Sequence, residues 1–163
     1  MYIPEIPDNN LKPLLEELVY IAKKLDSEVS GRDRFRVMFE FNRPATLEEI
    51  DTLEKELNVS LPTGYKEFLV FSNGAQLCGN TAEFDRTTKV AKMDKWEKIL
   101  DFPQDYITIA NLIGDGEILC FSKKTNKFIS YYEGEETVFE NFYEFFKWLL
   151  SFIRDKAEDY VEL

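Results

Sequence analysis

Hydrophobic residues in the middle of the chain recur every three to four positions, in two runs that Pro62 separates. This spacing predicts two helices that each bury one face. The first run is Leu47, Ile50, Leu53 and Leu57, and the second is Tyr65, Phe68, Leu69 and Phe71. Thr46 and Glu49 have the spacing of a capping box, which predicts the start of the first helix. Pro62 favours a first helical turn, and Asn73-Gly74 is typical of a helix stop because both residues tolerate a left-handed backbone.

The N-terminal part of the chain predicts a helix, a turn and a strand. The helix is expected to begin near Asn10 or Pro13, and residues 27–33, which include Gly31, are typical of a turn. The residues expected on the buried side of this helix are Leu11, Leu14, Leu15, Leu18, Ile21, Ala22 and Leu25. Residues 34–41 then alternate, with Phe35, Val37, Phe39 and Phe41 on one face and Arg34, Arg36, Met38 and Glu40 on the other. This alternation predicts a strand with one buried face.

Beyond Gly74 the pattern first weakens and then becomes regular again. Residues 78–81 are typical of a turn, and residues 88–91 predict a short strand. Residues 93–100 predict a helix with Trp96, Ile99 and Leu100 on its apolar side.

The C-terminal third predicts an antiparallel meander and a final helix. The three strands are expected at residues 106–112, 117–121 and 128–132, and the loops between them contain glycines or a polar tip. Asn141, a preferred cap residue, predicts the start of the last helix, with Glu144 three positions later. The apolar face of this helix is expected to hold Phe142, Phe145, Phe146, Leu149, Leu150, Phe152 and Ile153, with Trp148 at its border.

This order of elements predicts an α+β fold. We expect a single domain over residues 1–163, with N-terminal, central and C-terminal helices packed on an antiparallel or mixed sheet. The composition agrees, because 163 residues with 44% hydrophobic and 15% aromatic side chains are enough for one sizeable core. No apolar run approaches the length of a membrane span, and the first ten residues lack the basic segment of a secretory signal. A cytoplasmic location without membrane contact is therefore expected.

The sequence contains no histidine, which excludes many catalytic and metal-binding arrangements. Among them are the Ser-His-Asp and Cys-His arrangements, metal sites with histidine ligands and acid–base catalysis by histidine. Cys78 and Cys120 lie far apart without a C-x-x-C motif, so we expect them to pack in the interior rather than to bind zinc. Asp115 and Glu117 could form a carboxylate pair, but residues 114–116 favour a hairpin turn over a phosphate-binding loop. We therefore expect no enzymatic activity, no cofactor and no metal.

The formal net charge of −11 argues against binding to nucleic acid or to anionic membranes. From Glu133 to the last residue the chain has nine acidic and three basic side chains. A protein partner with a basic surface would complement this charge, although the charge could also serve solubility alone. The predicted contact residues are Glu133, Glu135 and Glu136, with Trp96 and Trp148 as aromatic anchors unless either belongs to the core.

The central part of the chain resembles the SUKH superfamily, which includes bacterial immunity proteins and fungal cell-wall assembly regulators. The resemblance depends on an acidic amphipathic helix at residues 48–57 and on a motif with an Asn-Gly end. The residues that match this motif are Leu61, Pro62, Tyr65, Phe68, Leu69, Asn73 and Gly74. A second element, residues 107–110 leading into Gly114-Asp115-Gly116, extends the resemblance to about residues 44–153. The resemblance implies an α+β fold, and we interpret the motif as fold residues rather than contact residues.

Two functions follow from this resemblance. The first is an immunity protein that binds and neutralises a cognate bacterial toxin, for example one that attacks nucleic acid and has a basic groove. The second is a regulatory scaffold that binds signalling or cell-wall-synthesis partners. A toxin gene beside the gene for this chain would favour the first function, whereas an isolated housekeeping locus would favour the second.

Overall fold

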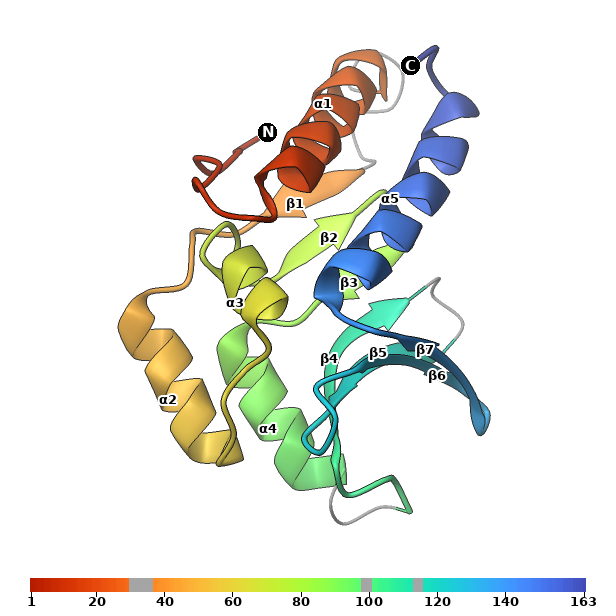
Figure 1. The fold of residues 1–163 in the computed structure, drawn as a ribbon. Coiled ribbons are helices and arrows are strands. Elements are labelled where there is room, and N and C mark those ends of the chain that lie inside the picture. The colour runs from red at the N-terminus through yellow and green to blue at the C-terminus, as the bar shows by residue number, and fades with distance from the viewer. Residues whose placement is uncertain (30–36, 98–100, 113–115) are drawn as a thin grey trace.

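Seven strands form one sheet in which every strand pairs antiparallel with its neighbours in sequence (Figure 1). The structure is a computed structural model that describes residues 1–29, 37–97, 101–112 and 116–163. The strands are β1 (Phe39–Phe41), β2 (Ala75–Leu77), β3 (Ala82–Phe84), β4 (Tyr106–Leu112), β5 (Glu117–Ser122), β6 (Phe128–Tyr132) and β7 (Glu135–Phe139). The helices are α1 (Lys12–Val29), α2 (Leu47–Leu57), α3 (Thr63–Leu69), α4 (Thr87–Glu97) and α5 (Phe142–Glu158). The α+β prediction is confirmed, and the sheet is antiparallel throughout.

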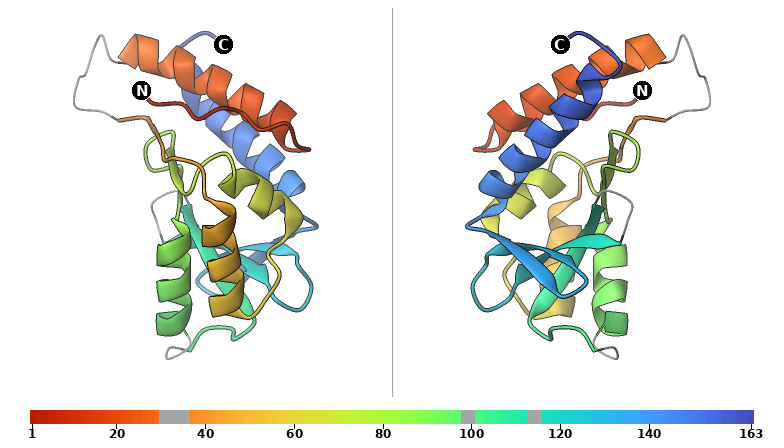
Figure 2. Two further views of the ribbon diagram at one scale, coloured as in Figure 1. Left: turned by 90° about the vertical axis from the view of Figure 1, so that its left-hand side faces the viewer. Right: turned by 90° about the vertical axis from the view of Figure 1, so that its right-hand side faces the viewer.

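The helices lie on both faces of the sheet. Phe121 of β5 packs against Tyr65 of α3, and its pairing partner on β4 is Ile107. The next residue, Thr108, points to the opposite face and donates a hydrogen bond to Glu97 of α4. Figures 1 and 2 show α1 and α5 side by side at one end of the molecule and α2 and α4 side by side at the other.

Aromatic rings fill the core between α3, α5 and the sheet. Phe68 is fully buried, and its ring centre lies 4.6–6.4 Å from those of four neighbouring rings. These rings belong to Phe71, Phe84, Phe142 and Phe146. The second predicted stripe, Tyr65, Phe68, Leu69 and Phe71, is confirmed as core. The α5 prediction is also confirmed, because Asn141 caps the helix by accepting from the amide of Glu144 at 3.0 Å.

The predicted start of α2 is confirmed, but one residue of its stripe is not buried. Thr46 and Glu49 form both hydrogen bonds of the capping box. Ile50, Leu53 and Leu57 are buried as expected, whereas Leu47 is 75% exposed. Leu47 is the first residue of the helix, and a step of three residues leaves it about 60° away from Ile50, at the margin of the stripe.

The N-terminal segment differs from its prediction at two places. Helix α1 continues to Val29, so residues 27–29 are helical, and the rest of the predicted turn lies outside the described residues. Of the strand predicted over residues 34–41, the described residues 37–41 contain only Phe39–Phe41. Val37 is 55% exposed and Met38 is buried, which reverses the predicted alternation there. Residues 34–36 lie outside the described part of the chain.

The prediction of a strand at residues 88–91 is wrong, because these residues belong to α4. The strand in this region is β3, which ends at Phe84. The side-chain amide of Asn73 explains the difference, since its oxygen accepts from the backbone N–H of Thr87 at 2.9 Å and caps the first turn of α4. Asn73 is therefore not the stop of α3, which ends at Leu69. The predicted helix at residues 93–100 overlaps only the second half of α4, and residues 98–100 lie outside the described part.

The meander of β4, β5 and β6 is confirmed, and β7 adds a fourth strand to it. The loop between β6 and β7 is short. Only Glu133 and Gly134 form the loop, with φ of 48° and 86°, as a two-residue hairpin turn requires. Glu135 and Glu136 belong to β7.

Candidate partner-binding surfaces

The tip of the β6–β7 hairpin presents three predicted contact residues. Glu133, Glu135 and Glu136 are all exposed there. In the described part of the chain, neither Glu133 nor Glu135 has an ion-pair partner. Glu136 accepts a hydrogen bond from the hydroxyl of Tyr106 at 2.8 Å, which fixes its carboxylate on the sheet. Burial and this bond raise the pKa of Tyr106 to about 12, so the hydroxyl keeps its proton at neutral pH.

The two tryptophans have different environments, and the structure does not bring them together. Trp148 is half-buried, with ring centres at 5.5 Å from Phe139 and 6.1 Å from Phe152. It therefore joins α5 to β7 and has only part of its ring available for a partner. Trp96 is 60% exposed on α4, which lies apart from the hairpin tip in Figures 1 and 2. The prediction of one site containing all five residues therefore requires a partner that reaches two separate places.

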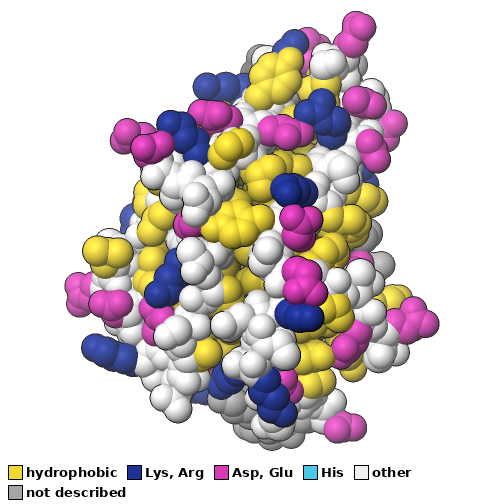
Figure 3. Space-filling model, in the orientation of Figure 1, with side chains coloured by type: hydrophobic (Ala, Val, Ile, Leu, Met, Phe, Trp, Pro, Cys, Tyr) yellow, Lys and Arg dark blue, Asp and Glu magenta, His cyan; other side chains and the backbone are white. Residues whose placement is uncertain are grey.

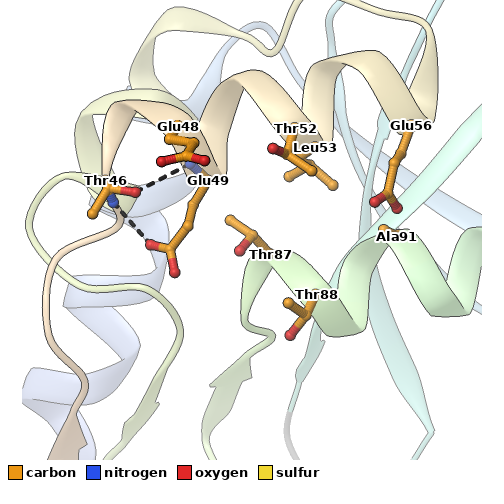
Figure 4. A pocket seen from close by; sticks show the side chains of 9 residues that line it. All are labelled: Thr46, Glu48, Glu49, Thr52, Leu53, Glu56, Thr87, Thr88 and Ala91. Carbon is orange, nitrogen blue, oxygen red and sulfur yellow. Dashed lines mark hydrogen bonds between the residues drawn. The ribbon is translucent and has the colours of Figure 1, made fainter.

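A groove of about 300 Å³ runs between α2 and α4 (Figure 4). Its lining residues are Thr46, Glu48, Glu49, Thr52, Leu53, Glu56, Thr87, Thr88 and Ala91. The carboxylate of Glu49 is already engaged, because it accepts from Thr46 and pairs with both terminal nitrogens of Arg43 at 2.5 and 2.9 Å. These bonds lower the pKa of Glu49 to about 2. Glu48 and Glu56 remain as exposed carboxylates that could accept a cationic side chain.

The residues Asn73 and Gly74 hold the loops behind this groove together. Besides capping α4 through its oxygen, the amide of Asn73 donates to the hydroxyl of Thr87 at 3.4 Å. The amide of Asn42 donates to the backbone oxygens of Asn73 and Gly74 at 2.9 and 3.0 Å. Both residues of the motif are buried. Their role is therefore to position α4, which agrees with their interpretation as fold residues.

Three acidic residues are buried beneath or beside α4. The exposed fractions of Asp85, Asp94 and Glu97 are 4%, 3% and 9%. Asp85 pairs with Lys89 at 2.6 Å, and Glu97 accepts from Thr108 at 3.0 Å. Burial raises the pKa of the carboxyls of Asp85 and Glu97. No group of three or more potential ligands that could hold a metal ion exists within the described residues.

The remaining chemical candidates of the sequence are also engaged or buried. Cys78 and Cys120 are both buried, as expected, and burial raises the pKa of the Cys120 thiol to about 12. The carboxylate of Glu117 accepts a hydrogen bond from the hydroxyl of Ser130. Asp115, its predicted partner in a carboxylate pair, lies outside the described residues. Cys78 also borders a hollow of about 310 Å³, next to Lys156 and Tyr160 from the C-terminal part of the chain.

The buried carboxyl of Glu97 predicts a measurable effect of pH. Burial raises its pKa, the bond from Thr108 offsets part of this, and the charge of Asp94 adds to it. A folded-state pKa above the unfolded value means that this carboxyl favours folding most at low pH, and that the gain is lost as the pH rises through the folded-state pKa. Glu97→Gln stays neutral and can still accept from Thr108. We expect its urea midpoint to exceed that of the wild type at pH 7 and to approach it below about pH 4.

The matched control is Glu56→Gln, because Glu56 is exposed on α2. Its midpoint should follow that of the wild type at both pH values. An equal difference between Glu97→Gln and the wild type at pH 7 and pH 4 would show that the charge of Glu97 has no part in the effect.

Residues 44–151 match the SMI1/KNR4 family (SUKH-1), which covers α2 to the middle of α5. The chain belongs to the SUKH-1 family. It is also 30% identical over 95 residues to a protein of Bacillus subtilis (strain 168) described as uncharacterized protein YnaB. That alignment covers 57% of this chain and 61% of YnaB. The resemblance to the superfamily is thus confirmed, and the matched region contains the whole Leu61–Gly74 motif.

The SUKH-1 region excludes α1, which nevertheless packs on α5 and contributes seven buried residues to the common core. Arg154 of α5 pairs with Glu17 of α1 at 2.5 Å across this contact. The described part of the chain has no helix long and apolar enough to cross a membrane.

Sequence reasoning missed two features that shape the candidate surfaces. Strand β7 had a local signal, since Glu133-Gly134 separates two short runs of strand-forming residues. The groove had none, because it forms where α2 meets α4, and α4 begins 30 residues after α2 ends.

Proposed function

We propose that this SUKH-1 protein is a non-enzymatic immunity protein that binds a toxin with a basic surface and blocks it. Family membership supports a protein of this class. The observation that carries the choice of partner is the acidic tip of the β6–β7 hairpin, where Glu133, Glu135 and Glu136 are exposed together. The proposal includes a cytoplasmic site of action, where a toxin that attacks nucleic acid would find its substrate.

The distribution of charge supports an electrostatic role for the hairpin. On the face shown in Figure 3, acidic and basic side chains are interspersed, so neighbouring charges largely offset each other there. The charges of Glu133 and Glu135 are not offset in this way, because no cation of the described chain pairs with either residue. An uncompensated cluster attracts a basic groove over a distance of about 10 Å at moderate salt and speeds encounter more than it slows dissociation.

The described residues also support a non-enzymatic role. The chain has no histidine. The groove between α2 and α4 is lined by threonines, carboxylates and aliphatic groups, without a paired nucleophile and base. Binding therefore explains the surface chemistry better than catalysis.

The test begins with co-expression of the chain and any toxin encoded beside its gene, followed by purification of the complex. Association and dissociation rates are then measured at several salt concentrations for the wild type and for Glu133→Lys with Glu135→Lys. We expect the double variant to associate roughly tenfold more slowly at low salt, with a weaker salt dependence and a nearly unchanged dissociation rate.

The control is Glu48→Lys with Glu56→Lys, which changes the net charge equally but at the α2–α4 groove. It should associate faster than the hairpin variant. Equal slowing by both variants would mean that net charge alone acts, and a wild-type association rate that is independent of salt would reject steering. Failure of the chain to bind or protect against the neighbouring toxin would reject the immunity function itself.

A further inference from the structure

Strand β7 is an edge of the sheet, and its register shows which of its backbone groups are unpaired. It is the last strand in the order and, among the described residues, pairs only with β6. The loop Glu133-Gly134 has two residues, so the flanking pair Tyr132↔Glu135 exchanges hydrogen bonds. The pairs Ser130↔Thr137 and Phe128↔Phe139, two and four residues further along β7, also exchange hydrogen bonds. The N–H and C=O groups of Glu136 and Val138 therefore point outward, to the free edge.

No other part of the described chain covers these groups. Neither backbone N–H takes part in any hydrogen bond outside the sheet. The side chains from Glu135 to Val138 are all exposed, and Val138 is 53% exposed. The strand is nevertheless packed against α5, because the ring centre of Phe139 lies 5.5 Å from those of both Trp148 and Phe145. The edge is thus an ordered strand with free donors and acceptors.

The side chains beside the free groups define what could bind. Phe139 faces α5, so Glu136 and Val138, of the opposite parity, face the other side of the sheet. A carboxylate held by Tyr106 and an exposed aliphatic group therefore stand two residues apart on one face. An incoming strand that pairs here would match them with a cationic and an apolar side chain, also two residues apart.

We propose that the β7 edge binds an extended, cationic segment of the protein partner as an added strand. This inference rests on the proposed function and names the surface and the binding mode. Backbone hydrogen bonds to Glu136 and Val138 would supply affinity, and the carboxylates of the hairpin would select Lys or Arg. A second copy of this chain fits poorly, because pairing two β7 edges brings their acidic side chains to within one strand spacing, about 5 Å.

Proline substitutions can test the free edge of β7 and the edge that pairs with β6 independently. Val138→Pro removes an N–H that β6 does not use, so the hairpin should still form, as proline is tolerated on the open side of an edge strand. Val138→Ala keeps the N–H and removes only the side chain. Thr137→Pro removes an N–H that bonds to Ser130 across the hairpin and should lower the unfolding midpoint clearly more than Val138→Pro.

The first experiment needs no toxin. The ¹⁵N-labelled chain is titrated with the synthetic peptide acetyl-Thr-Val-Thr-Lys-Thr-Val-Thr-amide, and amide shifts and hydrogen exchange are followed. We expect shifts and slowed exchange centred on Glu136 and Val138, at least tenfold weaker binding by Val138→Pro, and none with glutamate in place of the peptide's lysine. Unchanged amides of Glu136 and Val138 at millimolar peptide, or equal binding by Val138→Pro, would overturn the inference.

The second experiment uses the toxin complex. Val138→Pro is expected to weaken the complex at least tenfold and Val138→Ala by less, with both variants folded. Equal affinity of the wild type and Val138→Pro would overturn the strand-addition inference and leave the immunity function standing. If the wild type binds no toxin, the immunity function fails, and the peptide titration alone decides whether the edge accepts a cationic strand.

Discussion

Phe68→Ala is expected to lower the free energy of unfolding by about 3–5 kcal/mol. Phe68 is fully buried, and its nearest ring neighbour is Phe84, with ring centres 4.6 Å apart. The neighbouring rings belong to the segment just after α3, to β3 and to α5. Because separate elements hold them, they cannot all move into the space that the Phe68 ring would vacate. The variant therefore loses the transfer energy of the ring and also retains a cavity. Chemical denaturation followed by tryptophan fluorescence measures the change.

Leu47→Ala is the matched control for this prediction. Both residues belong to apolar stripes with helical spacing, but Leu47 is 75% exposed. Its replacement should change the free energy of unfolding by less than about 0.5 kcal/mol. Comparable losses for both variants would contradict the assignment of Phe68 to the core and of Leu47 to the surface.

Gly74→Ala is expected to be the second most damaging of these substitutions, at roughly 3 kcal/mol. Gly74 has φ of +81°, which strains any other residue. A Cβ atom at this position would lie 2.8 Å from the backbone oxygen of Phe84 and 2.9 Å from the backbone nitrogen of Arg86. Since both contacts are with backbone, relief requires a shift of the segment that leads into α4. The same denaturation measurement tests this.

Gly134→Ala is the control that distinguishes the strain of a positive φ from the steric clash at Gly74. Gly134 has φ of +86°, but a Cβ atom there would meet nothing within 4 Å. Its replacement should therefore cost only the conformational strain, about 1–2 kcal/mol. If Gly74→Ala cost no more than Gly134→Ala, the close approach of Gly74 to Phe84 and Arg86 would have no energetic weight.

The case of Gly74 also explains why the Asn-Gly motif matters for the candidate surfaces. Gly74 allows the chain to pass against residues 84–86, and Asn73 then reaches the first turn of α4. Together these contacts fix the position of α4 and hence one wall of the groove with α2. Asn73 and Gly74 contact no partner in our proposal, but they determine the shape of the α2–α4 groove, which is a candidate binding surface.

The sequence alone determined the elements whose signals are local. Thr46 and Glu49 are three residues apart, so their capping box formed as predicted, and the cap of Asn141 on α5 did likewise. The strands β4, β5 and β6 and the buried face of α3 followed from periodicity, because alternation and helical spacing depend on neighbouring residues only. The family resemblance over residues 44–153 was equally readable from a short motif, and the match over 44–151 confirms it.

Tertiary structure alone decided the features that depend on distant parts of the chain. Residues 88–91 have β-branched character but are helical, because Asn73, 14 residues before Thr87, caps α4. Periodicity placed Leu47 in a stripe, but burial required another element to lie over it, and none of the described elements does. Which strand forms the edge is likewise invisible in any local pattern. The free backbone groups of Glu136 and Val138 exist because β7 comes last in the sheet, and strand order is a property of long-range pairing.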